Sequence, residues 1–143
     1  MDERATRGRA VEAAAWAANL VFAGTAVPLA LGADGLEGVA VGVALVLFLL
    51  GLVVWCWALG AAFLRSANGD HIVVTTLFLM EGRVPARIRW SLYGALTACL
   101  VITAGTAAAD PFGVLVPLLP LGLVGLWGAR HGDFPARPAR PGH

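Results

Sequence analysis

Residues 38–64 read GVAVGVALVLFLLGLVVWCWALGAAFL, an uninterrupted apolar stretch without a single charged side chain. A helix needs about 20 mainly apolar residues to cross about 30 Å of hydrocarbon. Three more runs approach or exceed this length, at about 11–31, 90–109 and 112–129. The fourth run is the shortest, and Pro117 and Pro120 are expected to kink it. The sequence therefore predicts an all-α, polytopic membrane protein with four transmembrane helices.

Short connections set the expected arrangement of these helices. The first and second runs are joined by about residues 33–37, and the third and fourth by Asp110 and Pro111. Connections this short join antiparallel neighbours. We therefore expect two antiparallel hairpins in a single transmembrane domain, 11–129, between an N-terminal segment, 1–10, and a tail, 130–143.

The arginines indicate the orientation of the bundle. The ten arginines precede the first run, separate the second from the third, or follow the fourth: Arg4, Arg7, Arg9, Arg65, Arg83, Arg87, Arg89, Arg130, Arg137 and Arg140. The two remaining connections contain Asp34, Glu37 and Asp110 but no positive charge. Positive residues that flank membrane spans stay in the cytoplasm. We expect a multi-pass protein of a bacterial plasma (inner) membrane with both termini cytoplasmic.

Composition supports the same class of protein. The chain is 59% hydrophobic and 13% charged, with a mean hydropathy of +0.79. A soluble domain averages about a quarter charged residues. The net charge of +1 also argues against a soluble nucleic-acid-binding domain, which would be strongly basic. The bilayer is the expected environment, and nucleic acid is not an expected partner.

The first apolar run has a second interpretation. A basic start, Pro28, and the stretch Ala30-Leu31-Gly32 also fit a secretory signal peptide with a cleavage site. The run is longer than the usual apolar core of such peptides, about 7–15 residues, and this favours a retained helix.

The connection between the second and third runs contains a further apolar segment. Ile72–Met80 follows the turn signal Asn68-Gly69-Asp70 and is too short to span. We interpret it as a short interfacial or re-entrant helix at about 71–81, capped by Asp70 and Gly82. A β-strand over Ile72–Thr76 is the alternative, although an unpaired strand would leave backbone groups unsatisfied.

Few polar side chains lie inside the predicted spans. Asn19 is the one strongly polar residue deep in the first span, and an interhelical hydrogen bond is its expected role. Glu12 lies near the interface, where Arg9 is within one helical turn. Cys56 and Cys99 are expected to be apolar thiols at equal depth, although a redox pair or shared metal would also fit that depth.

Small residues and tryptophans suggest how the helices pack. Gly38 and Gly42 form a GxxxG pair, and Gly122, Gly125 and Gly128 line part of the fourth span. Such residues allow close helix packing, within one bundle or between copies in a homo-oligomer. All five tryptophans fall in the arginine-side halves of their spans: Trp16, Trp55, Trp57, Trp90 and Trp127. Helix packing is the favoured role of Trp16, Trp55 and Trp57, and a cavity lining is the alternative.

The cytoplasmic side contains the remaining candidates for contact or chemistry. Six arginines are expected to contact a partner or anionic headgroups: Arg83, Arg87, Arg89, Arg130, Arg137 and Arg140. Proline recurs at every third position of the tail, Pro135, Pro138 and Pro141, which favours an extended segment. Asp70, His71, His131 and Asp133 form a weak polar cluster that would suit a divalent metal or acid–base chemistry if the residues converged. They lack motif spacing, so we expect no catalytic residue, metal or cofactor.

The layout, the absence of lysine and the ending Gly125-Leu-Trp-Gly-Ala-Arg-His-Gly132 resemble small uncharacterised four-span membrane proteins of high-GC bacteria. This resemblance implies a fold but no activity. A carboxylate in the first of four spans is also found in small multidrug resistance transporters. Their glutamate lies well inside the span, whereas Glu12 is interfacial, so the chain does not fit that family.

These observations favour a non-enzymatic role. A membrane-embedded accessory or interaction protein, alone or in a homo-oligomer or larger complex, explains the missing catalytic set and the minimal outer loops. A small oligomeric transporter or channel is the alternative, although the spans offer a poor polar pathway. A membrane enzyme that acts on lipid or phosphate groups is the third interpretation.

Overall fold

The computed structural model describes residues 3–69, 78 and 84–132, and their regular structure is entirely helical. The elements are α1 (Glu3–Ala30), α2 (Glu37–Ala67), α4 (Ala86–Thr106), the 3₁₀ helix η1 (Pro111–Leu115) and α5 (Leu118–His131). Four segments are long and apolar enough to cross a membrane, the fourth of them formed by η1 and α5 together. The all-α, four-span prediction is confirmed, and the fold is that of a multi-pass membrane protein.

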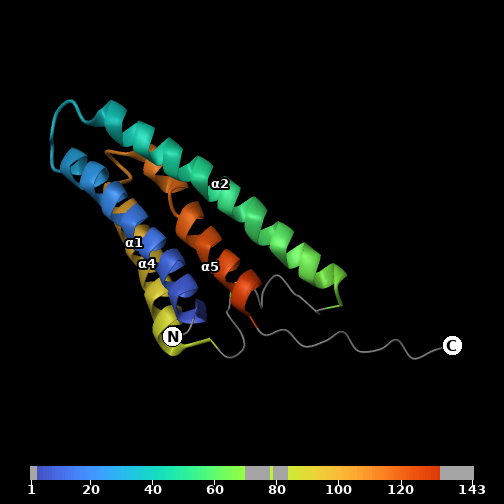
Figure 1. Ribbon diagram of the computed structural model, residues 1–143. Coiled ribbons are helices and arrows are strands. Elements are labelled where there is room, and N and C mark those ends of the chain that lie inside the picture. Colours follow the sequence, from blue (N-terminus) through green and yellow to red (C-terminus); the bar gives the residue numbers. More distant parts are fainter. Residues whose placement is uncertain (1–2, 70–77, 79–83, 133–143) are drawn as a thin grey trace.

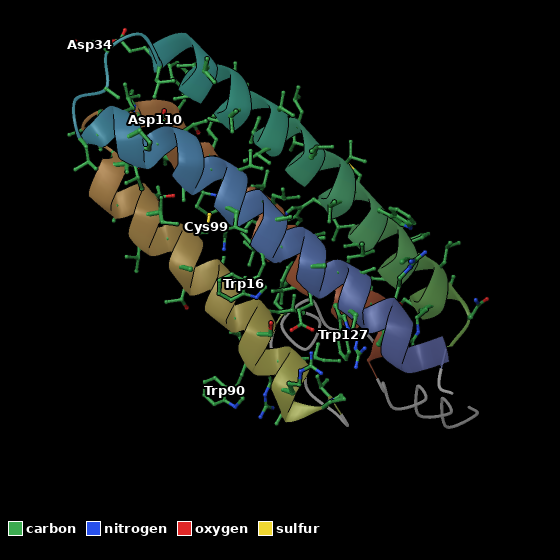
Figure 2. All side chains as sticks on the ribbon, turned by 60° about the vertical axis from the view of Figure 1, so that its left-hand side comes forward. Trp16, Asp34, Trp90, Cys99, Asp110 and Trp127 are labelled. Carbon is green, nitrogen blue, oxygen red and sulfur yellow. The ribbon has the colours of Figure 1, made fainter. Side chains whose placement is uncertain are left out.

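Consecutive segments alternate in direction along an elongated bundle (Figure 1). The arginines of the described residues lie near the start of α1 and α4 and near the end of α2 and α5: Arg4, Arg7, Arg9, Arg65, Arg87, Arg89 and Arg130. We call this end the arginine-rich end. The opposite end contains Asp34, Glu37 and Asp110, and we call it the acidic end (Figure 2).

The closest helix pairs are parallel rather than the hairpin partners. Contacts between α1 and α4 join residues 75 or 76 positions apart, as in Trp16 with Ser91 and Asn19 with Ala95. Two hydrogen bonds between α2 and α5 join residues 63 and 64 positions apart, Trp55 with Leu118 and Arg65 with Ala129. A constant separation along two helices requires that they run in the same direction. The two hairpins therefore pack side by side, with α1 beside α4 and α2 beside α5.

The fourth segment occupies the interior of the bundle. In its apolar stretch 67% of the residues are buried, against 22–28% in the other three segments. Every residue from Gly122 to Ala129 is buried. Phe22, Leu92, Val116 and Val124 are the largest apolar side chains that are almost completely buried. The lipid-facing surface is thus provided mainly by α1, α2 and α4, which leaves their outward residues exposed.

Proline divides the fourth segment instead of bending one continuous helix. η1 ends at Leu115, and α5 begins at Leu118 after Pro117 as its N-cap. Pro120 then lies in the first turn of α5, where the backbone N–H groups have no partner within the helix. The missing N–H of Pro120 therefore costs no helical hydrogen bond. The structure therefore has a break at Pro117 where the sequence predicted a kink, and Pro120 fits within α5.

Glycine permits the tight connection at the acidic end. Gly32 and Gly35 have φ values of 90° and 84°, a region that side chains with a Cβ rarely adopt. The carbonyl oxygen of Pro28 accepts from the N–H of Leu31 at 3.1 Å and of Ala33 at 3.0 Å. These bonds satisfy the end of α1, so the chain reverses within a few residues and starts α2.

The segment predicted as an interfacial helix, 71–81, lies outside the described residues except for Phe78. The ring of Phe78 lies 5.1 Å from that of Trp55 and packs over the backbone of Gly125. Its carbonyl oxygen accepts a hydrogen bond of 2.7 Å from the hydroxyl of Tyr93. Phe78 therefore links α2, α4 and α5 near the arginine-rich end.

Candidate functional site

Two arrangements of polar side chains stand out from the apolar packing. The first is a group at the arginine-rich end, formed by Trp57, Arg65, Trp127, Arg130 and His131. The second is a row of polar groups between α1 and α4, which we call the α1–α4 seam.

Arg65 stabilises the end of α5 rather than facing open solvent. Its guanidinium Nη1 donates to the carbonyl oxygens of Ala129 at 3.1 Å and Gly132 at 3.0 Å. The last carbonyl groups of a helix lack partners within the helix and carry partial negative charge. The Arg65 guanidinium supplies hydrogen-bond donors for these carbonyl groups, and its positive charge offsets their partial negative charge. Sequence reasoning identifies Arg65 only as a topology marker, because the end of α5 is brought beside it by the tertiary fold.

Arg130 presents its charge at the bundle surface. Its guanidinium carbon lies 4.7 Å from the centre of the Trp57 ring, a cation–π distance. Trp57 is 53% exposed, and Arg130 is also exposed. Next along the chain, the His131 ring stacks on Trp127 with centroids 5.0 Å apart. The end of α5 thus combines cationic and aromatic groups from two neighbouring helices.

A cavity of about 560 Å³ opens beside this group. Its described lining consists of Ala10 and Val11 from α1 and Arg130 and His131 from α5. The buried Trp127 indole packs against α1 nearby, and its Nε1 is 3.3 Å from where a Cβ on Gly8 would be. The lining places positive charge beside an apolar helix face, which suits an anionic group attached to an apolar tail.

The α1–α4 seam begins at the arginine-rich end. Arg87 contacts the Glu12 carboxylate at 3.5 Å, so the described ion pair of Glu12 crosses to α4 instead of lying along α1. One turn further, the indole N–H of Trp16 donates to the hydroxyl of Ser91 at 3.1 Å. Asn19 Nδ2 then donates to the carbonyl oxygen of Ala95 at 2.7 Å in the buried core.

The seam continues along α4 toward the acidic end. Cys99, Thr103 and Thr106 are buried at successive turns and are followed by Asp110. The Thr103 hydroxyl donates to the carbonyl oxygen of Gly113 at 3.4 Å, and that of Thr106 to Ile102 at 2.8 Å. In Figure 2, Asp110 lies at the end shared with Asp34, and Cys99 lies between it and Trp90. Polar groups therefore follow one face of α4 from end to end.

Asp110 is the functional candidate that sequence reasoning missed. The sequence places it in an outer connection, but only 1% of its surface is exposed. Its Oδ1 accepts from the N–H of Gly113 at 3.2 Å and caps η1. An aspartate directly before a proline at a helix start is an N-cap signal that the sequence contains, Asp110-Pro111. Its burial depends on α1, which brings Phe22 beside Gly113.

The predicted site residues are only partly brought together. Arg87, Arg89 and Arg130 lie at the arginine-rich end, and His131 contributes to the cavity there. The remaining predicted residues lie outside the described part of the chain: Asp70, His71, Arg83, Asp133, Arg137 and Arg140. Within the described residues, no group of three or more His, Cys, Asp or Glu side chains could hold a metal ion.

The two cysteines differ from each other in burial, and so do the tryptophans. Cys99 is fully buried in the seam, whereas Cys56 is exposed on α2, and both are free thiols. Trp55 packs inward, where its indole N–H donates to the carbonyl oxygen of Leu118 at 3.2 Å. Trp16 is 41% exposed and Trp57 faces outward beneath Arg130.

The glycines differ in whether they closely contact another helix. A Cβ on Gly51 would lie 3.0 Å from the backbone nitrogen of Leu119, and one on Gly122 would lie 2.8 Å from Trp55 Cδ1. These glycines permit the close α2–α5 packing. By contrast, a Cβ on Gly38 or Gly42 would meet no described atom within 4 Å, so this GxxxG pair makes no close helix contact among the described residues. Comparisons with protein-family models, curated proteins and solved structures found no match to the chain.

Proposed function

We propose that this chain is an integral membrane accessory or interaction protein that works through its arginine-rich end. We place that end, with both termini, on the cytoplasmic side of a bacterial plasma membrane, because arginines that flank spans stay inside. The exposed aromatic and cationic side chains at this end support the proposal.

The observation that carries this proposal is the pairing of Arg130 with Trp57. The guanidinium and the ring lie 4.7 Å apart, and Trp57 is 53% exposed. Trp90, at the start of α4, is 71% exposed at the same end. Tryptophan settles at headgroup depth, and arginine there attracts anionic lipid or an acidic partner surface. An exposed aromatic and cationic surface of this kind suits recognition rather than catalysis.

A photo-crosslinking experiment tests the proposal in the native membrane. Trp90→benzoylphenylalanine places a photoreactive ring at the arginine-rich end, where the native side chain is 71% exposed. Leu31→benzoylphenylalanine is the matched control, because Leu31 is 83% exposed at the acidic end. Irradiated cells should yield a discrete protein adduct from position 90 and none from position 31.

The mass of the adduct identifies the kind of partner. An adduct of twice the monomer mass indicates a homo-oligomer, and a different mass indicates a larger membrane complex. Both results support an interaction protein. Lipid adducts alone from position 90, together with a lone monomer in mild detergent, would contradict it.

The α1–α4 seam favours a second candidate, a small oligomeric transporter or channel. Buried Asn19, Thr103, Thr106 and Asp110 give the interior more polar character than an inert packing core requires. A proteoliposome flux assay distinguishes this role from the first.

A membrane enzyme that acts on lipid or phosphate groups is the third proposal. It predicts a lost lipid product when Asp70, His71, His131 and Asp133 are replaced together.

A further inference from the structure

The cavity at the arginine-rich end contains a positive charge that no described acid neutralises. Its volume of about 560 Å³ lies within the range of about 300–1,000 Å³ that is typical of small-molecule sites. Arg130 lines the cavity, and among the described residues no carboxylate pairs with it. Glu12, on the neighbouring helix α1, is engaged instead by Arg87 at 3.5 Å. The charge of the lining therefore favours an anionic ligand.

The negative end of the α5 dipole does not cancel this charge. The last carbonyl groups of a helix carry partial negative charge, which would repel an anion. Here the Arg65 guanidinium donates to the carbonyl oxygens of Ala129 at 3.1 Å and Gly132 at 3.0 Å. Because a separate arginine compensates the helix end, the charge of Arg130 remains available to a ligand.

A second cavity lies further along the same face of α1, and its described lining has no polar side chain. It has a volume of about 300 Å³ and is bounded by one residue of α1 and five of α2: Val21, Val39, Gly42, Val43, Val46 and Leu47. At 3.6 residues per turn, Val21 projects from nearly the same face of α1 as Ala10, which lines the first cavity about 16.5 Å away along the helix. Ala14 and Ala17 lie between them on this face, and both are exposed.

The surface of α2 also leads from the apolar cavity to Arg130. Val46, Leu49 and Val53 are exposed and follow one another at helical spacing. The next residue at this spacing is Trp57, whose ring lies beneath the Arg130 guanidinium. Figure 1 shows α1 and α2 diverging from their short connection toward the arginine-rich end, where α5 lies between them. An apolar path bounded by α1 and α2 therefore connects a cationic cavity to an apolar one.

We propose that this path binds one anionic phospholipid, with its phosphate group at Arg130 and an acyl chain that extends along α1 and α2 to the cavity at Gly42. An anionic group with an apolar tail matches both cavities and the surface between them. Basic pockets between membrane helices bind anionic headgroups in this way. Free phosphate would compensate Arg130 but would leave the apolar cavity without a ligand. The site goes beyond the proposed function and does not depend on it, because a lipid can occupy this path whether or not Trp90 contacts a protein.

Native mass spectrometry of the full chain in detergent, titrated with phosphatidylglycerol or phosphatidylcholine, tests the cationic end. Wild type should retain one phosphatidylglycerol more tightly than phosphatidylcholine. Arg130→Gln should weaken phosphatidylglycerol binding about fivefold, which corresponds to about 1 kcal/mol per arginine near headgroups, and should remove the preference. Arg89→Gln is the matched control, because it removes the same charge from the same end and Arg89 is not among the described lining of either cavity. Its binding should equal that of wild type.

The same titration of Gly42→Leu tests the apolar end. The new side chain would fill the space for the acyl chain, so binding of both lipids should weaken. Gly105→Leu on α4 is the matched control and should bind as wild type does. A Cβ on either glycine would meet no described atom within 4 Å, so neither variant should overpack the bundle. Circular dichroism confirms that each variant is folded before its binding is compared.

A photoactivatable phosphatidylglycerol, with a diazirine at the end of its acyl chain, locates the bound lipid in bilayers. Adducts should concentrate on the residues that line the apolar cavity. An even spread over the exposed faces of α1, α2 and α4 would indicate bulk lipid only and would overturn the proposal. Equal phosphatidylglycerol binding by wild type and Arg130→Gln would also overturn it. Displacement of the lipid by inorganic phosphate would do the same, because the site would then bind a free anion.

Discussion

Asn19 on α1 donates its side-chain amide to the carbonyl oxygen of Ala95 on α4 at 2.7 Å, in the buried centre of the bundle. This bond fixes the register of two parallel helices that are far apart in the sequence. It lies in line with the Trp16–Ser91 bond and the Glu12–Arg87 ion pair, at separations of 75 or 76 residues. These three contacts hold α1 against α4, although the chain connects α1 directly to α2.

Asn19→Ala should lower the free energy of unfolding by about 1 kcal/mol or less, because interhelical hydrogen bonds within membranes contribute only this much. Denaturant titration of the detergent-solubilised protein, followed by circular dichroism, measures the change. Thr25→Val is the matched control, since the Thr25 hydroxyl donates to Phe22 within its own helix. Equal losses from the two variants would contradict a specific role for the α1–α4 bond.

Gly51→Ala should destabilise the bundle by about 1–3 kcal/mol, the usual cost of overpacking a tight interior. The added Cβ would meet the backbone of Leu119 at 3.0–3.2 Å, and a backbone cannot rotate away as a side chain can. Gly60→Ala on the same helix meets nothing within 4 Å. We expect that control to unfold at the same denaturant concentration or slightly later, because alanine favours helix. A tolerated Gly51→Ala would show that α2 and α5 are not in close contact.

Arg65→Met should weaken the end of α5, because the carbonyl groups of Ala129 and Gly132 would lose a charged donor. Hydrogen bonds to charged groups contribute about 1.5–3 kcal/mol, and partial solvent exposure places the expected loss near the lower limit. Hydrogen exchange of the last turn of α5 provides the local measurement. Arg130→Met, at an exposed arginine, should leave that turn protected. Equal exchange in both variants would indicate that Arg65 does not act as the cap.

The membrane orientation predicts which cysteines a membrane-impermeant maleimide reaches. In a background of Cys56→Ala and Cys99→Ala, Asp34→Cys should react in intact cells and Trp90→Cys only after permeabilisation. Both native side chains are exposed, so a difference reports the side of the membrane rather than burial. The reverse labelling pattern would place the arginine-rich end outside and would refute the cytoplasmic assignment.

The sequence predicted the elements far better than the contacts between them. The four apolar runs are local properties, because crossing hydrocarbon requires length and apolarity that can be counted along the chain. The break at Pro117 is also local in origin, although the sequence suggested a bend instead. The role of Gly51 could not be deduced, since Gly38, Gly42 and Gly60 are equally small and yet meet no neighbour.

By itself the sequence determined the helical class, the four spans and the separation of arginines from acids, since these follow from solvation of individual segments by lipid. The tertiary structure alone decided that α5 is the central helix and that α1 pairs with α4. It also decided that Arg65 caps α5 and that Asp110 is buried with one oxygen unpartnered among the described residues. These properties depend on which faces meet, and in a chain apolar on every side the helix faces are nearly equivalent until small residues and hydrogen bonds select a partner.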